Sequence, residues 1–180
     1  MTVSYYQQKQ IIAKVDRKGK IIGRVEKWDA HKKGILHKGF SVILKYKNYY
    51  FLQHRKHPLF DGMYDLTISS HQKFDGNNLQ NDEDAVLEAI AREWEVEKED
   101  IGKIKYIGKV YYKVKDIKSK FIEHEMCDLL EVKINRISLP NFDFAYGFSL
   151  AKKEEVVNKK GRVYEFLAPW VKVAIEKGML

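Results

Sequence analysis

The sequence predicts a mixed α/β fold formed by a single domain over residues 1–180. One observation is the order of the local patterns, in which β-hairpins come first, followed by a helix, long strands and further helices. Another is size and composition, because 180 residues with 44% hydrophobic content suit one domain with a proper core. No internal repeat or low-complexity linker divides the chain.

Two hairpins are expected in the first third of the chain. The first is "IIAKVDRKGKIIGRVEKW", with a polar turn at Asp16–Gly19, and the second is "FSVILKYKNYYFLQHR", with a turn at Lys47–Asn48. The intervening "DAHKKGILH" is predicted to be a loop. After the second hairpin, "HPLFDGMYDLTISSHQKFDGNN" mixes short apolar runs with Pro and Gly, which indicates loops and a short strand.

The second half is expected to contain one long helix, two long strands and a helical C-terminal region. Asp82 or a neighbour can cap a helix that runs through about Lys98. Residues 103–113 and 120–134 are strand-like, and "LPNFDFAYGFSL" is predicted to be irregular and then a strand. The segment "AKKEEVVNK" favours a short helix, and "RVYEFLAPWVKVAIEK" favours a C-terminal helix broken at Pro169.

Composition narrows the classes of partner. The net charge of +8 permits a nucleic acid or another phosphorylated partner, but the lysines are scattered without a long basic block, which argues against nucleic acid. No apolar stretch approaches the roughly 18 residues of a membrane span, and "MTVSYYQQKQ" lacks the apolar core of a signal peptide. The single cysteine, Cys127, excludes an internal disulfide and fits a reducing compartment. We therefore expect a cytoplasmic protein without a membrane partner.

Acidic residues lie on the apolar side of the predicted central helix. At 100° per residue, Glu93 and Glu97 share the arc that holds Val86 and Ile90. Carboxylates at the edge of such a stripe can reach solvent, and this is the simpler interpretation. If they are buried, they need a partner or a metal ion, because an unpaired buried charge is costly.

The segment "FIEHEMCDLL" raises the same question in a strand. Side chains alternate along a strand, so Glu123 and Glu125 point to the face that also holds Cys127. Two neighbouring carboxylates repel one another unless a cation lies between them. Three histidines, His31, His37 and His71, are each ordinary surface or loop candidates, but together with the carboxylates they would suit zinc, manganese or iron.

The segment "DAVLEAIAREW" resembles the Nudix box, with matches at Asp84, Arg92, Glu93, Trp94 and Glu97 and departures at Asn78, Val96 and Glu99. From about Ile11 to Trp170, the chain resembles the type 1, Nudix-related isopentenyl-diphosphate delta-isomerases. The resemblance is carried by "VEKWDAHKKGILHKGFSVIL", "LTISSHQ", "NDEDAVLEAIAREWEVE", "KVYYKV", "FIEHEMCDL" and "APW". It implies a single Nudix-like domain with its core at about 35–155. The implied fold is an α/β/α sandwich with a mixed β-sheet, an N-terminal hairpin extension and a C-terminal helix.

The same resemblance implies two kinds of metal site. The family's transition-metal ligands correspond here to His31, His37, His71, Glu123 and Glu125, which would hold one Mn²⁺ or Zn²⁺. The remaining Nudix-helix glutamate corresponds to Glu93, which in the family is associated with a Mg²⁺ that bridges to the substrate diphosphate. Lys27 and Arg55 match basic residues that hold the diphosphate.

The implied reaction interconverts isopentenyl and dimethylallyl diphosphate by protonation and deprotonation, in isoprenoid biosynthesis. Glu125 with Tyr112 would serve one face of the substrate, and Ser69 stands on the other face where the family has a cysteine. A hydroxyl is a far weaker acid than a thiol, so Ser69 is a departure with chemical consequences. The nearest match to the aromatic residue that covers the cation is Tyr164, whereas Trp170 is expected to be structural.

Two other functions are compatible with these residues. A metal-dependent Nudix diphosphate hydrolase would use Glu93 and Glu97, but it leaves the three histidines unexplained. A non-catalytic module that binds a diphosphate or RNA would explain Ser69 and the positive charge. For the isomerase, the expected partner is a small allylic diphosphate, and the expected state is a monomer or weak dimer.

Overall fold

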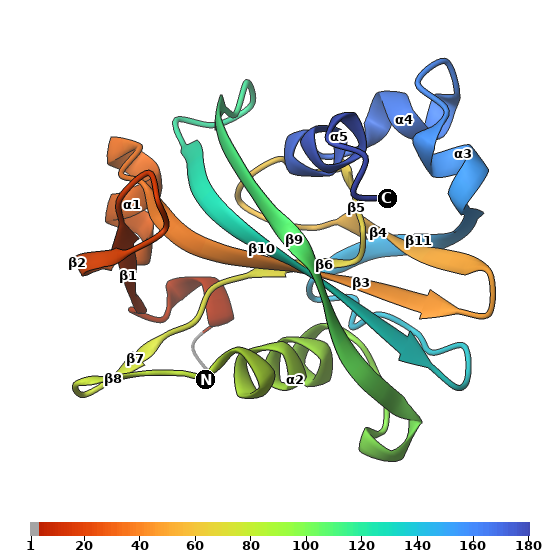
Figure 1. Cartoon of the computed structure of the whole chain (residues 1–180), viewed down its shortest axis with the longest axis horizontal. Coiled ribbons are helices and arrows are strands. Elements are labelled where there is room, and N and C mark those ends of the chain that lie inside the picture. Colours follow the sequence, from red (N-terminus) through yellow and green to blue (C-terminus); the bar gives the residue numbers. More distant parts are fainter. Residues whose placement is uncertain (1–3) are drawn as a thin grey trace.

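The computed structural model describes residues 4–180 and contains a mixed β-sheet with helices on both faces (Figure 1). The strands of the chain are β1 (Ile11–Val15), β2 (Ile21–Glu26), β3 (His37–Tyr46), β4 (Tyr49–Arg55), β5 (Tyr64–Asp65), β6 (Ile68–Ser70), β7 (Phe74–Asp75), β8 (Asn78–Leu79), β9 (Ile101–Lys115), β10 (Ile122–Ile134) and β11 (Ala145–Lys152). Strands β7 and β8 pair with each other in a separate small sheet. The helices are α1 (Lys27–Lys33), α2 (Asp82–Glu93), α3 (Lys153–Val157), α4 (Arg162–Phe166) and α5 (Pro169–Glu176), with 3₁₀ turns at Tyr5–Gln7 and Lys98–Asp100.

Strand β3 is the centre of the sheet. It pairs in parallel with β10, from Glu125 opposite His37 to Lys133 opposite Lys45, and antiparallel with β1, β4 and β6. Strand β9 continues the sheet beyond β10, while β11 continues it beyond β4. One parallel pair among antiparallel neighbours makes the sheet mixed, as predicted from the sequence.

Two hydrophobic clusters lie on opposite faces of the sheet. Along β10, Cys127 and Leu129 pack toward α5, whereas Leu130 and Val132 pack toward α2. This alternation is the period of two expected for a strand covered on both sides. Figure 1 shows α2 beneath the sheet and α5 above it. The predicted mixed α/β class, with an α/β/α arrangement, is therefore confirmed.

Most of the predicted elements are also confirmed. Both hairpins turn where expected, and Lys47 at the second turn has a left-handed φ of 53°. The two long strands, the strand of β11 and the short helix α3 are present. Pro169 opens α5 and separates it from α4, because proline fits the first turn of a helix but not its interior. The segment predicted as loops with a short strand contains four short strands, β5 to β8.

The prediction of a loop at "DAHKKGILH" is wrong, because this segment contributes most of α1. The Glu26 side chain accepts a hydrogen bond from the backbone amide of Asp29, and Gly34 ends the helix with a left-handed φ of 61°. Seven residues are too few to display an apolar stripe, so the sequence pattern hides the helix. The correction matters because α1 carries Lys27 and His31.

The central helix is shorter than predicted. It begins after its cap, Asn81, and ends at Glu93, not near Lys98. Trp94 takes an extended conformation with ψ of 140° and forms a bridge to Pro140. The helical projection therefore holds for Glu93, which is buried, and is wrong for Glu97, which is exposed beyond the end of the helix.

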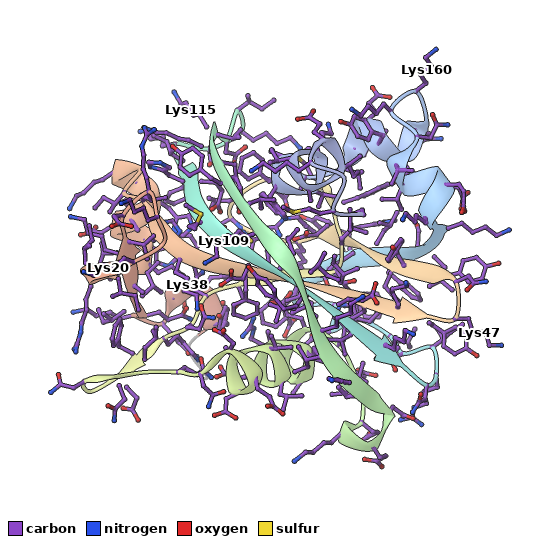
Figure 2. All side chains as sticks on the ribbon, in the orientation of Figure 1. Lys20, Lys38, Lys47, Lys109, Lys115 and Lys160 are labelled. Atoms are coloured by element: carbon purple, nitrogen blue, oxygen red, sulfur yellow. The ribbon has the colours of Figure 1, made fainter. Side chains whose placement is uncertain are left out.

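Lysines are spread over many elements in Figure 2. The labelled examples come from the β1–β2 turn, β3, the β3–β4 turn, β9 and the α3–α4 loop: Lys20, Lys38, Lys47, Lys109, Lys115 and Lys160. Of the helices within residues 4–180, none is both long and apolar enough to cross a membrane.

Candidate metal centre

The three predicted histidines and the two glutamates of β10 come together at one end of the sheet. His31 comes from α1, His37 begins β3 and His71 follows β6. The parallel register of β3 and β10 sets Glu125 opposite His37. Ligand-type atoms of His31, His37, His71 and Glu125 all lie within 4.8 Å of one another. A spacing of this size is what a single bound cation requires of its ligands.

Backbone carbonyls orient two of the imidazoles. Nδ1 of His31 lies 2.6 Å from the carbonyl oxygen of Lys27, and Nδ1 of His37 lies 2.8 Å from that of Ile35. A carbonyl can only accept, so each Nδ1 carries a proton, and each Nε2 has a free lone pair when its ring is neutral. Such a second hydrogen bond is the usual support of a metal-binding histidine. Both Nε2 atoms face the carboxylates of β10.

The two carboxylates complete the cluster. Nε2 of His31 is 3.3 Å from Oε1 of Glu123, while Nε2 of His37 and of His71 are 3.2 Å and 2.8 Å from Oε1 of Glu125. Glu123 and Glu125 are only 6% and 5% exposed. Nε2 of His37 and Oε2 of Glu123 are buried without a hydrogen-bond partner. A buried polar atom without a partner is costly, so the two atoms fit a coordinated cation.

Two protonation states in the cluster also favour a cation. Burial lowers the pKa of His71 to about 4 against the opposing effect of Glu125, so its imidazole is neutral near pH 7. Burial alone would raise the pKa of Glu125, but the His37 and His71 rings bring it well below its usual range. For His31, burial lowers the pKa, but the charge and hydrogen bond of Glu123, together with the Lys27 carbonyl and Glu125, raise it overall. A metal ion that binds His31 must therefore displace a proton when this ring is charged.

Glu93 lies at the C-terminal end of α2, on the wall of an adjoining cavity. Its carboxylate accepts from Nη2 of Arg92 at 2.7 Å and from Nε2 of Gln53 at 3.1 Å. Gln53 in turn accepts from the indole of Trp94 at 2.6 Å. Within residues 4–180, Glu93 is the one carboxylate of α2 that lines this cavity.

The cavity has an internal volume of about 30 Å³ and connects the histidine–glutamate cluster to the positively charged side chains of Lys27, Arg55 and Arg92. The predicted residues Lys27, Arg55, Ser69 and Tyr112 line it. Sequence reasoning did not assign a site role to several other lining residues: Tyr5, Tyr6, Trp28, His57, Arg92 and Trp170. Arg92 belongs to the Nudix-box-like segment and Trp170 to "APW", so these two residues could have been found from the motifs. Tyr5 and Tyr6 belong to no motif, so the sequence did not indicate them.

The positively charged side chains of the cavity contact aromatic rings and Asp65. Nζ of Lys27 lies 4.8 Å from the ring centre of Tyr5, and the Arg92 guanidinium lies 4.2 Å from the same ring. Arg55 is buried, and its Nη1 donates to Asp65 Oδ2 at 2.6 Å. These positive groups suit an anion with several oxygens, such as a diphosphate.

The apolar end of the cavity is formed by Tyr112 and Trp170. The Tyr112 hydroxyl donates to Oε2 of Glu125, and its ring stacks on Trp170 at 5.8 Å between centres. The Trp170 indole donates to Oδ1 of Asp65 at 2.9 Å. Tyr164 does not line the cavity, because α4 directs its hydroxyl toward Glu176 at 3.5 Å. The predicted substrate-binding residue Tyr164 is therefore not among the lining residues of this cavity, whereas Trp170 is.

Gly39 gives the Glu125 carboxylate its space. A Cβ atom at Gly39 would lie 2.5 Å from Oε1 of Glu125. That carboxylate is tied to His71 and Tyr112, so it cannot move away without losing its partners.

We expect Gly39→Val to reduce bound transition metal at least tenfold, because the new side chain displaces Glu125. Mass spectrometry of the metal content measures this loss. Gly23→Val on β2 is the matched control, since a Cβ there meets nothing within 4 Å. Equal metal content in the two variants would contradict the role given to Gly39.

Comparisons with known proteins place the architecture. No family model matches the chain, and no curated protein matches it. A Deinococcus radiodurans protein, DR0079, matches with a TM-score of 0.69 at 10% identity, over 93% of this chain and 98% of that one. A MutT Nudix hydrolase of Burkholderia pseudomallei gives 0.56 at 14%, over 78% and 96%. An Ap4A hydrolase of C. elegans gives 0.55 at 11%, over 78% and 93%. Such low identities carry the architecture alone, and on that evidence the chain has the Nudix fold.

Proposed function

We propose that this protein is an isomerase that interconverts isopentenyl diphosphate and dimethylallyl diphosphate. The observation that carries the proposal is the convergence of three histidines and two glutamates on one buried point, directly beside Tyr112 and Ser69. A hydrolase of the diphosphate has no evident use for this cluster. An isomerase needs it to fix one charged carboxylate beside an apolar chamber. We further propose that the chain is a single Nudix-like domain, with its core at about 35–155, and that it acts in the cytoplasm.

In this reaction the substrate gains one proton and loses another, so its atoms and its net charge are the same before and after. An acid on one side protonates the terminal double bond and leaves a tertiary carbocation. A base on the other side then removes a proton from the neighbouring carbon, and the double bond re-forms there. We assign Ser69 to one side and Glu125 with Tyr112 to the other. The rings of Tyr112 and Trp170, which stack on one another in the cavity wall, would present an aromatic surface to this positive charge.

The diphosphate is proposed to lie at the cationic end of the cavity. Lys27, Arg55 and Arg92 bind its oxygens there, while Glu93 would hold a Mg²⁺ that neutralises further charge. The cluster residues His31, His37, His71, Glu123 and Glu125 would hold one Mn²⁺ or Zn²⁺. When bound, that ion supplies the positive charge that keeps Glu125 ionised in a buried place. Chain residues perform the remaining tasks of binding, orientation and proton transfer.

A direct assay tests the proposal. Purified protein with Mg²⁺ and Mn²⁺ is expected to convert isopentenyl diphosphate to its dimethylallyl isomer, followed by proton NMR, without release of phosphate. Phosphate release without isomer would favour a hydrolase. Tight binding of RNA or a diphosphate with no turnover of either kind would favour the non-catalytic module. Absence of a transition metal after reconstitution would remove the basis of the proposal.

A Nudix diphosphate hydrolase is the second candidate, since two of the similar structures are hydrolases by name. Their fold is shared with this chain, but fold alone does not carry function. Hydrolysis at a diphosphate relies on a cluster of carboxylates around Mg²⁺. Here α2 ends at Glu93 and leaves Glu97 exposed, so Glu93 is the one carboxylate that α2, within the described residues, offers to the cavity.

Ser69→Cys is expected to raise the turnover number of the isomerase about tenfold or more. A thiol has a pKa of about 8.5, far below that of an aliphatic hydroxyl, and an effective general acid contributes about 10² to 10⁴ in rate. Initial rates with isopentenyl diphosphate measure the change. Ser149→Cys is the matched control, because Ser149 is a half-buried strand serine of β11 that does not line the cavity. A neutral or harmful Ser69→Cys would place the acid elsewhere.

Catalytic efficiency is expected to fall as the pH rises through about 8. Burial and the nearby charge of Arg92 lower the pKa of Lys27 to about 8, and a lysine is charged only below its pKa. Above that pH, the free protein loses a positive charge that binds the diphosphate. Lys27→Arg keeps its charge across this range, so its profile of kcat/KM against pH should lack the alkaline fall. An identical fall in both proteins would assign it to another group.

A further inference from the structure

We infer that Ser41 is a positioning residue that sets the hydroxyl of Ser69 as a hydrogen-bond donor toward the cavity, with the Cys127 thiol donating to Ser41 from behind. The inference rests on the proposed function, in which Ser69 faces the substrate. It deepens that function by naming two buried residues, Ser41 and Cys127, that touch neither substrate nor metal. Ser41 lies on β3, which pairs directly with β6, the short strand that carries Ser69, and Cys127 lies on β10, the neighbour of β3.

Three adjacent strands bring these side chains into line. Ser41 is paired with Ser69 across β3 and β6, and Cys127 is paired with Gly39 across β10 and β3. Oγ of Ser41 lies 2.8 Å from Oγ of Ser69 and 3.5 Å from Sγ of Cys127. Ser41 is 2% exposed and Cys127 is fully buried, so water does not compete for these contacts. The chain of contacts runs from the core to the wall of the cavity.

The direction of the two hydrogen bonds follows from the chemistry of the groups. Ser41 has one hydrogen to donate, and its possible acceptors are an oxygen and a sulfur. A thiol sulfur is a weak acceptor, so the Ser41 hydroxyl donates to Ser69. The Ser41 oxygen then has a free lone pair for the thiol hydrogen of Cys127. The competing acceptor for that hydrogen, the carbonyl of Asp128, lies farther away at 3.8 Å.

The consequence falls on Ser69. Its oxygen accepts from Ser41, so its own hydrogen has to point elsewhere. Throughout residues 4–180, its hydroxyl has no hydrogen-bond partner other than Ser41. Since Ser69 lines the cavity, its hydrogen points into the chamber, where the proposed acid is needed. Without Ser41, the hydroxyl of Ser69 loses this constraint and rotates freely among its rotamers.

The chain offers a clean spectroscopic test because Cys127 is its single cysteine. The S–H stretching band in the Raman spectrum of the full protein therefore reports this thiol alone. We expect the band at the lowered frequency of a hydrogen-bond donor, and we expect Ser41→Ala to move it. Ser69→Ala should move it too, because Ser41 then loses its acceptor and turns its hydrogen toward the sulfur. A band unaffected by both substitutions overturns the inference.

Turnover supplies the second measurement. Ser41→Ala is expected to lower kcat about tenfold while KM for isopentenyl diphosphate stays within about twofold, because orientation and not binding is lost. Ser41→Thr, which keeps the hydroxyl, should restore most of kcat. Ser149→Ala is the matched control, as Ser149 is a half-buried strand serine bonded to His54 on β4, outside the cavity. An unchanged kcat in Ser41→Ala, with an active wild type, overturns the positioning role.

The two measurements separate this inference from the proposed function. If the wild type does not isomerise but its S–H band responds to Ser41→Ala and Ser69→Ala, the proposed function fails and the direction of the hydrogen bonds is upheld. If the wild type isomerises and the band does not respond, the function stands and the inference fails.

Discussion

Glu125→Gln is expected to abolish transition-metal binding and to lower isomerase turnover by at least about 10³-fold. One oxygen of this carboxylate faces His37 and His71, and the other accepts from Tyr112. A glutamine must turn its amide group toward one of these neighbours, and it carries no negative charge for a cation. Metal content after reconstitution and initial rates with isopentenyl diphosphate measure the two losses.

Glu131→Gln is the control on the same strand. Glu131 is half-buried and pairs with Lys45 at 3.2 Å, far along β10 from the histidines. This variant should keep its metal and stay within about twofold of wild-type turnover, as expected for a peripheral ion pair. Full metal content and turnover in Glu125→Gln would refute the candidate centre, whatever the control does.

Asp65→Ala is expected to destabilise the protein by about 3–5 kcal/mol, because it leaves the buried guanidinium of Arg55 without its counter-charge. Asp65 is fully buried, and its two oxygens have separate tasks. Oδ2 accepts from Arg55, and Oδ1 accepts from the Trp170 indole and the amide of Leu66. The free energy of unfolding in urea measures the loss.

Asp29→Ala gives the comparison for an exposed ion pair. Asp29 pairs with Lys33 at 3.1 Å on the surface of α1, where such pairs contribute about 0–1 kcal/mol. If Asp65→Ala cost no more than Asp29→Ala, the ion pair of Arg55 would be irrelevant to stability. Asp65→Ala should also raise KM for the diphosphate. Asp65 holds both Arg55 and Trp170, and these two side chains line the cavity.

The strands were predictable because their pattern is strong and local. Both hairpins carry β-branched runs around polar turns, and β9 is rich in Ile, Val and Tyr, which favour strands. The convergence of His31, His37, His71 and Glu125 was suggested by the chemistry of these residue types and by the family resemblance, but not by their spacing in the sequence. Positions so far apart in the sequence contain no information on distance until a register joins them, and the β3–β10 pairing supplies that register.

The errors have physical causes that sequence patterns do not display. The helix α1 is too short to show periodicity, and its start depends on a side-chain cap from Glu26. The early end of α2 depends on the bridge from Trp94 to Pro140, a contact between distant segments. Trp170 was expected to be structural, and it does bond to Asp65, but α5 also turns its ring toward Tyr112. One residue can serve packing and chemistry together.

The β3–β10 pairing also has a consequence for how the protein folds. Its contacts join residues far apart in the chain, so the metal centre cannot assemble until a large loop has closed, at a high cost in entropy. A cation held by α1, β3, β10 and the segment after β6 would act as a cross-link that the unfolded chain lacks. The population of folded protein would then rise with the concentration of free metal, and metal supply would help to set the protein's lifetime.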